Sequence, residues 1–195
     1  MVFGCHRGCP LSIGLLLEGK SDERVISRLV ARCCNSSPTL YVRKLSGHGN
    51  MFNLRKVTAL VDSLVREHPD VSKIAVCVDQ DCEPERKGKA FDAEMGLSDL
   101  QRPVKYCVVT QALEGWLLAD ATAVSKWIGK SLQTPNPEEL CNPNKWLKDA
   151  LRKHTPKRTY NKITDGSRLA ELVTCEVVVQ RNASFGKFLE LVCQT

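Results

Sequence analysis

The chain has 195 residues, of which 43% are hydrophobic and 26% are charged, and its formal net charge is +6. These values are typical of a soluble globular protein with its own core, and they exclude collagen-like, coiled-coil and disordered chains. No apolar run approaches the ~20 residues that cross a bilayer. The apolar stretch near the N-terminus runs into charged residues without a small-residue cleavage site. We therefore expect a cytoplasmic protein with no signal peptide and no membrane partner.

Ten cysteines are scattered through the chain. Several lie in apolar runs, where a free cysteine behaves as a small hydrophobic residue, so we expect most of them to be reduced core residues. Cys5, His6 and Cys9 are candidate metal ligands, but Cys33 and Cys34 lack the separation of a second zinc-ligand pair, which favours no zinc site. The cysteines in apolar runs include Cys33, Cys77, Cys107 and Cys193.

Hydrophobic periodicity predicts four strands and a series of helices. Short, mostly apolar runs predict strands at 13–17, 40–45, 74–78 and 104–110. Apolar residues at helical spacing predict helices at 25–33, 54–65, 90–100 and 113–128. Beyond residue 129 prolines and asparagines interrupt the pattern, and we expect short helices at 145–153 and 185–192.

Strands that alternate with amphipathic helices are typical of a parallel sheet covered on both faces. The sequence therefore predicts an α/β fold: a Rossmann-like parallel sheet of about four strands flanked by helices, with a helical C-terminal extension. We divide the chain into an N-terminal extension (1–11), an α/β core (12–130) and a C-terminal extension packed on the core (131–195).

The segment 145–162 carries seven basic residues against the single acidic residue Asp149. A local basic segment suits a polyanion such as nucleic acid, because phosphate contacts release condensed counterions. Charge alone favours a solvated surface about equally. The basic residues are Lys145, Lys148, Arg152, Lys153, Lys157, Arg158 and Lys162.

Acidic residues follow the predicted strands, where ligands gather in such a sheet. Glu18 follows the first strand, Asp79 and Asp81 follow the third, and Glu114 comes just after the fourth. Asp22 lies one helical turn after Glu18 and can point to the same crevice. Carboxylates this close repel one another unless a cation lies between them, and their oxygens suit Mg²⁺ or Mn²⁺.

The spacing of Asp79 and Asp81 fits one metal site, because alternate residues of an extended segment face the same way. In the alternative interpretation Asp79 caps a turn and Asp81 is solvated. The coincidence with Glu18 at a neighbouring strand end favours the metal site. Glu114 has two interpretations as well: it binds metal, or it caps a helix start beside Trp116.

These segments resemble the Toprim domain shared by topoisomerases, DnaG-type primases and OLD-family nucleases. They also resemble a small Toprim-like family of unknown function, domain-of-unknown-function family 4276. The resemblance covers about 15–192 and implies a Toprim fold. It depends on EGKSDE at 18–23, VCVDQD at 76–81, EGWLLAD at 114–120 and the C-terminal pattern that includes YNK at 160–162.

The resemblance implies roles for individual residues. Glu18 matches the glutamate that acts as general acid or base or binds metal, and Asp79 and Asp81 match the aspartates that hold divalent metal for phosphoryl transfer. Asp22 matches a further metal ligand of OLD-like nucleases. Lys162, a catalytic candidate, and Arg158 would supply positive charge near a developing oxyanion. Nucleic-acid contacts are assigned to Lys20, Arg152, Lys153, Lys157, Arg158, Tyr160 and Lys162, with Tyr160 able to stack on a base.

The leading hypothesis is a metal-dependent nuclease-like phosphoryl-transfer protein that acts on DNA or RNA with Mg²⁺ or Mn²⁺. The alternative is a non-catalytic module that binds metal and nucleic acid or nucleotide. The resemblance also implies an ABC-type or AAA-type ATPase partner in defence or repair. The chain has no ATPase motif of its own, so any ATP dependence would come from that partner.

Overall fold

The computed structural model describes residues 11–45 and 47–193, without the side chains of Lys20 and His48. Cys5, His6 and Cys9, and with them the question of a zinc site, lie outside these residues. None of the described helices is both long and apolar enough to cross a membrane. The elements in chain order are β1 (Ser12–Leu17), α1 (Lys20–Cys33), β2 (Thr39–Lys44), η1 (His48–Phe52), α2 (Leu54–Glu67), β3 (Lys73–Asp79), α3 (Arg86–Gly96), β4 (Val104–Val109), α4 (Leu113–Leu118), α5 (Ala121–Ile128), α6 (Pro143–His154), α7 (Thr164–Leu172), α8 (Cys175–Arg181) and α9 (Ala183–Val192).

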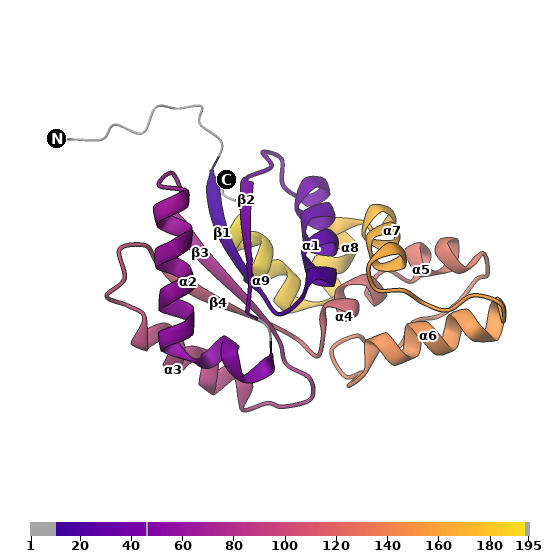
Figure 1. The fold of residues 1–195 in the computed structure, drawn as a ribbon. Coiled ribbons are helices and arrows are strands. Elements are labelled where there is room, and N and C mark those ends of the chain that lie inside the picture. The colour runs from indigo at the N-terminus through magenta and orange to yellow at the C-terminus, as the bar shows by residue number, and fades with distance from the viewer. Residues whose placement is uncertain (1–10, 46, 194–195) are drawn as a thin grey trace.

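The four strands form one parallel sheet in the order β2-β1-β3-β4, with helices on both faces (Figure 1). Every residue of β1 is buried, as a central strand of a covered parallel sheet requires. The edge strand β2 is only partly buried. The predicted α/β fold, a four-stranded parallel sheet flanked by helices with further helices at the C-terminus, is confirmed.

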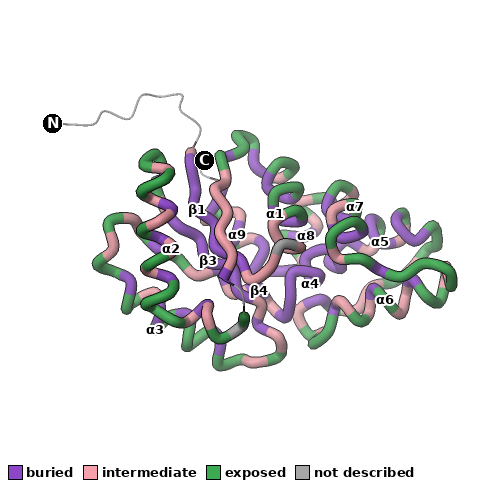
Figure 2. The backbone as a smooth tube through the Cα atoms, in the orientation of Figure 1, coloured by how far each residue is buried: buried purple, intermediate pink, exposed green. Residues whose placement is uncertain are grey.

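Alternate strand residues supply two separate apolar layers. Leu16, Ile74 and Val76 pack with α2 on one face, and Leu15 and Ala75 pack with α1 on the other. In Figure 2 the central strands β1 and β3 are largely buried, whereas the outer surfaces of the helices are exposed. Asp79 continues the second alternation, so its side chain belongs to the α1 face of the sheet.

Gly14 lets α2 approach β1 closely. A Cβ at this position would lie 2.4 Å from Ile74 Cδ1 and 3.0 Å from Leu64 Cδ2, so any other residue would require these side chains to move.

The C-terminal helices share the core of the α1 face. Helix α7 packs on α1, and α9 packs on β4. Trp116 of α4 is completely buried with its ring centroid 5.1 Å from those of Phe185 and Phe188 of α9.

The predicted helix 113–128 is divided in two. Asp120 interrupts it, because its Oδ1 accepts hydrogen bonds from the amides of Thr122 and Ala123 and so starts a new helix, α5. Asp120 Oδ2 accepts from the amide of Thr174, at the start of α8. One buried carboxylate therefore joins two helices, and the periodicity of the apolar residues gives no sign of it.

The expectation that most cysteines are reduced is wrong for the described residues. Three disulfides join Cys33 to Cys175, Cys34 to Cys193 and Cys82 to Cys141. Cys77 and Cys107 are free and buried, as predicted. Apolar surroundings suit a free cysteine and half of a disulfide equally well, so local sequence does not distinguish them. The bonds tie α1 to the C-terminal helices, and the loop after β3 to the segment before α6.

Candidate acidic site at the carboxyl edge of the sheet

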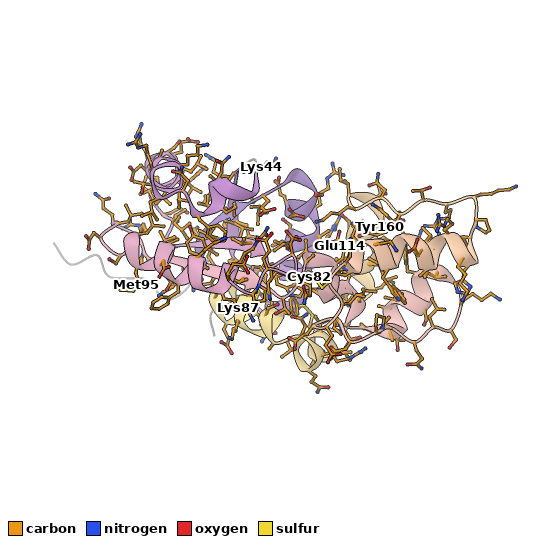
Figure 3. The ribbon with its side chains drawn as sticks, turned by 90° about the horizontal axis from the view of Figure 1, so that it is seen from below. Lys44, Cys82, Lys87, Met95, Glu114 and Tyr160 are labelled. Atoms are coloured by element: carbon orange, nitrogen blue, oxygen red, sulfur yellow. A yellow bond between two sulfur atoms is a disulfide. The ribbon has the colours of Figure 1, made fainter. Side chains whose placement is uncertain are left out.

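The carboxyl ends of β1 and β3 lie next to each other, since the two strands pair. Glu18 follows β1, Asp79 ends β3, and Asp22 lies in the first turn of α1. Together they line a cavity of about 10 Å³, close to the volume of one water-sized sphere. Seen from below in Figure 3, Glu114 lies in the middle of this edge, with Tyr160 toward the C-terminal helices. We refer to Glu18, Asp22, Asp79 and Glu114 as the acidic cluster.

Asp79, at the end of β3, is partly buried and faces the start of α4. Its Oδ1 accepts a hydrogen bond of 3.0 Å from the amide of Leu113, one of the amides that a helix leaves unsatisfied at its N-terminus. Burial raises the pKa of Asp79 well above its ordinary value, Lys162 opposes this, and the carboxylates of Asp22 and Glu114 add to the increase. A cation beside Asp79 would therefore stabilise its ionised form.

Asp22 has a structural contact and a contact within the site. Its Oδ2 accepts from the amide of Gly19 at 3.2 Å, which closes the first turn of α1. Its Oδ1 lies 2.8 Å from Lys162 Nζ. The turn after β1 therefore fixes this carboxylate toward the C-terminal part of the chain.

Lys162 lies between two carboxylates of the acidic cluster. Its Nζ is 3.4 Å from Glu114 Oε1, which also accepts from Asn144 Nδ2 at 2.8 Å. Burial lowers the pKa of Lys162, but the carboxylates of Glu114, Asp22 and Asp79 outweigh this and raise it. Lys162 is therefore a charged ammonium group held at the acidic edge. Glu114 lies in the first turn of α4, but among the described residues its side chain does not cap that helix start, so the capping interpretation is wrong. Its role as a metal ligand stays a prediction.

Asp81 turns away from the extended path of β3. Its φ is +49° and that of Cys82 is +60°, left-handed conformations that cost energy in residues other than glycine. Asp81 Oδ2 accepts from Arg86 Nη1 at 2.8 Å. The expectation that Asp79 and Asp81 face the same way on an extended segment is wrong, because the backbone leaves that conformation at Asp81.

Arg86 organises this loop, and the sequence gives no sign of it. The guanidinium is buried, donates to the backbone oxygen of Asp79 at 2.6 Å, and pairs with Asp81 and Glu83. From the sequence alone, an arginine in a polar segment is expected to be exposed to solvent. Asn144 is also missed, because its contact with Glu114 joins residues 30 positions apart.

Tyr160 is buried, with 4% of its surface exposed, and its ring packs edge-on against Trp127. Its hydroxyl is buried and has no hydrogen-bond partner among the residues that the structure describes. Burial raises the pKa of Tyr160, and the charge of Glu114 adds to the increase. The ring is therefore not presented at the surface where a nucleobase would stack.

The predicted nucleic-acid residues divide into two groups. Arg152, Lys153 and Lys157 are exposed, beyond or near the end of α6. Arg158 pairs with Asp165 at 3.1 Å and lies over the Trp127 ring, so internal contacts hold it. Lys20 begins α1, and its side chain is outside the described residues.

The donor chemistry of the acidic cluster fits a hard divalent cation, because three carboxylates line one small cavity and Asp79 is partly buried there. The spacing is less favourable: within residues 11–45 and 47–193 no three His, Cys, Asp or Glu side chains lie close enough to hold a metal ion. Lys162 provides positive charge between Asp22 and Glu114.

Fold and site define an α/β protein with a Rossmann-like parallel sheet and, at its carboxyl edge, an acidic cluster in which Glu114 is buried and the other three carboxylates are partly buried. The sequence matches the family described as "Domain of unknown function (DUF4276)" over residues 17–192, and the chain belongs to that family. No curated protein and no solved structure matches the chain.

Proposed function

We propose that this protein is a metal-dependent phosphoryl-transfer protein of the nuclease type, acting on DNA or RNA. The observation that carries the proposal is the acidic cluster: carboxylates that follow β1, end β3 and begin α4 converge at one edge of the sheet, with Lys162 among them. The resemblance of the sequence to Toprim domains supports the same chemistry.

Glu18, Asp22 and Asp79 are the residues whose oxygens would bind Mg²⁺ or Mn²⁺ in this proposal, after their side chains move closer together than they lie among the described residues. When bound, the ion would polarise a phosphate and lower the pKa of a water molecule. Asp79 is rigidly placed for this role by its hydrogen bond to the Leu113 amide. Glu18 is the general base of the proposal, because it lines the same cavity and its carboxylate can accept a proton from the attacking water.

Lys162 is the proposed oxyanion-binding group. Its side chain is 26% exposed, so the ammonium can reach a phosphate oxygen while it stays beside Asp22. A preorganised cation next to developing negative charge stabilises the transition state. Asp81, held by Arg86, shapes the loop at the entrance to the site and remains a candidate ligand in this proposal.

Incubation of the purified chain with plasmid, single-stranded DNA and RNA tests the proposal in Mg²⁺, Mn²⁺ or EDTA. We expect cleavage with metal, none in EDTA, and a loss of at least ~100-fold in Asp79→Asn, which keeps the hydrogen-bond acceptor for Leu113 but removes the charge. Asp62→Asn, an exposed carboxylate of α2, is the matched control and should cleave normally. Equal cleavage by Asp79→Asn and the unchanged chain would refute the proposal.

A second candidate is a module that binds metal and nucleic acid or nucleotide without turnover. The observation in its favour is that the described residues form no group of three metal ligands, while Lys162 already offsets part of the acidic charge. Mn²⁺ binding together with no cleavage of any of the substrates would support this candidate.

Two further parts of the proposal concern the cellular setting. We propose an ABC-type or AAA-type ATPase as partner, in defence or repair, on the resemblance alone. A cytoplasmic location is proposed as well, and the three disulfides weigh against it, because such bonds persist mainly in oxidising compartments.

A further inference from the structure

A groove runs along one side of α6, away from the acidic cluster. It encloses about 470 Å³ and is walled on one side by α6 and on the other by the segment between α5 and α6, including Leu132, Gln133 and Leu140. The residues that α6 contributes recur three or four positions apart, so they form one face of the helix. They are Lys145, Trp146, Asp149, Ala150, Lys153 and His154.

Trp146 is the aromatic residue of this groove. It packs partly against the core, yet it is only half-buried and lines the open groove. The opposite face of α6, with Leu147 and Leu151, is completely buried. Leu147 and Leu151 already anchor α6 to the core, and part of the Trp146 ring remains open to the groove.

The charge of the groove suits a polyanion. Lys145 and Lys153 line it, and Lys148 and Arg152 lie on the same helix. Asp149 is the acidic residue of α6, and its two oxygens face Lys145 Nζ and Arg152 Nη2, each at 3.2 Å. Its charge is therefore offset locally, and the helix keeps an excess of positive charge toward its C-terminal end.

Helix α6 also contacts the acidic cluster, but through another face. Asn144 in its first turn donates to Glu114, and Asn144 does not line the groove. A strand bound in the groove would therefore lie on a helix that also contacts the proposed phosphoryl-transfer site. Figure 1 shows α6 along the outer side of the C-terminal helices.

We infer that the α6 groove binds single-stranded nucleic acid, with one unstacked base on Trp146 and the neighbouring phosphates on Lys145 and Lys153. A duplex keeps its bases stacked inside and cannot offer one to the indole, whereas a single strand exposes the face of every base. The inference rests on the proposed function for its nucleic-acid ligand and adds the strand type and the place of the contact.

Intrinsic fluorescence tests the inference, because Trp116 and Trp127 are buried and Trp146 is partly exposed. The full chain is titrated in EDTA with a decamer of deoxythymidylate and, separately, with a DNA duplex of the same length. We expect saturable quenching by the single strand, with an affinity at least ~10-fold higher than for the duplex. No quenching, or equal affinity for the duplex, would overturn the inference.

Three variants locate the contact, with binding followed by anisotropy of a labelled decamer. Trp146→Ala should weaken binding by about 5- to 150-fold, and Trp146→Phe, which keeps an aromatic face and is the milder change for folding, should weaken it less. Lys153→Gln should weaken binding and reduce its salt dependence. Lys89→Gln on α3, also an exposed lysine, is the control and should bind normally. Unchanged binding in both Trp146 variants would overturn the inference.

The experiment separates this inference from the proposed function. Quenching in EDTA combined with no cleavage in metal would leave the groove intact and refute only the nuclease activity. Metal-dependent cleavage without quenching would refute only the groove.

Discussion

Lys162 balances charge at the acidic edge, where Glu114 is buried and Asp22 and Asp79 are partly buried. A buried carboxylate without a partner is costly, because it has lost its water and gained no compensating charge. Lys162 therefore has a structural role as well as the proposed role in binding a phosphate oxygen.

Replacing Lys162 tests the structural role. Because Lys162→Met leaves the carboxylates of Asp22 and Glu114 without this cation, we expect the free energy of unfolding near pH 7 to fall by about 2–3 kcal/mol, less than for a fully buried pair since the side chain reaches solvent. Urea denaturation measures the change. Lys89→Met, an exposed lysine of α3, is the control, and an equal effect in both variants would contradict the assigned role.

Asp79 makes folding stability depend on pH. Its pKa in the folded chain is above the ordinary value of 3.8, so its contribution to stability is complete below about pH 4 and is lost as pH rises through the folded-state pKa. Asp79→Asn removes this loss. We therefore expect the variant to melt at a higher temperature than the unchanged chain at pH 7, and the difference to shrink toward pH 4.

Melting curves at several pH values measure this difference. The Asp62→Asn control should show no such trend, because the residue is exposed. If Asp79→Asn instead melts at a lower temperature than the unchanged chain at pH 7, the ionised Asp79 stabilises the fold and the prediction is contradicted.

Sequence reasoning identified much of the acidic site at the residue scale. Glu18, Asp22, Asp79 and Glu114 were placed together because parallel strands end at one edge, and the structure brings them there with Lys162. Neither the turn at Asp81 nor the burial of Tyr160 was predicted. Tyr160 is buried against Trp127, which is far from it in the sequence. The turn at Asp81 depends on left-handed backbone conformations and on the contact with Arg86, and the hydrophobic pattern encodes neither.

At the scale of elements, Asp120 shows how one side chain sets the architecture. Its carboxylate is buried and accepts hydrogen bonds at the start of α5 and from the amide of Thr174 at the start of α8. The position of α8 relative to α5 therefore depends on a contact between segments 54 residues apart.

Removing this carboxylate should loosen both helix starts. We expect Asp120→Ala to lower the free energy of unfolding by about 2–4 kcal/mol, because it loses a helix cap and leaves the Thr174 amide without its acceptor. Asp120→Asn, which keeps one oxygen acceptor, should lose less. Chemical denaturation checks the order of the three chains, and equal stability of Asp120→Ala and the unchanged chain would exclude the double role.

The strands were predicted better than the helices. Each strand lies within one or two residues of its expected range, because turn residues bound each short run and the runs are too short for helices. Helices α7 and α8 were missed because they are short, with 9 and 7 residues, so neither is long enough to show a helical period of apolar residues. The periodicity of 113–128 was real, but a capping carboxylate divided it.

At the scale of the whole molecule, three disulfides connect parts of the chain that are far apart in sequence. The bond from Cys33 to Cys175 spans 142 residues, and that from Cys34 to Cys193 spans 159. Cross-links between such distant residues restrict the unfolded chain strongly. The cysteines are thus part of what holds the C-terminal helices on the sheet.

Peptide mapping without reductant tests the pairing. We expect a cross-linked peptide that contains Cys82 and Cys141, and Cys77 and Cys107 alkylated only after unfolding, because both are buried. Reduction should lower the melting temperature, in line with the ~2–5 kcal/mol lost when native disulfides are removed. Free alkylation of Cys82 and Cys141 in the folded chain would contradict this bond.

The central claim is that the acidic cluster binds a divalent cation, and calorimetric titration of Mn²⁺ into the metal-free chain tests it most directly. We predict saturable binding to the unchanged chain and to Asp62→Asn, and binding at least ~10-fold weaker to Asp79→Asn. The Asp79 carboxylate is poorly solvated, so its interaction with a cation contributes strongly to the binding free energy. Undetectable binding to the unchanged chain, or equal binding to Asp79→Asn, would contradict the account.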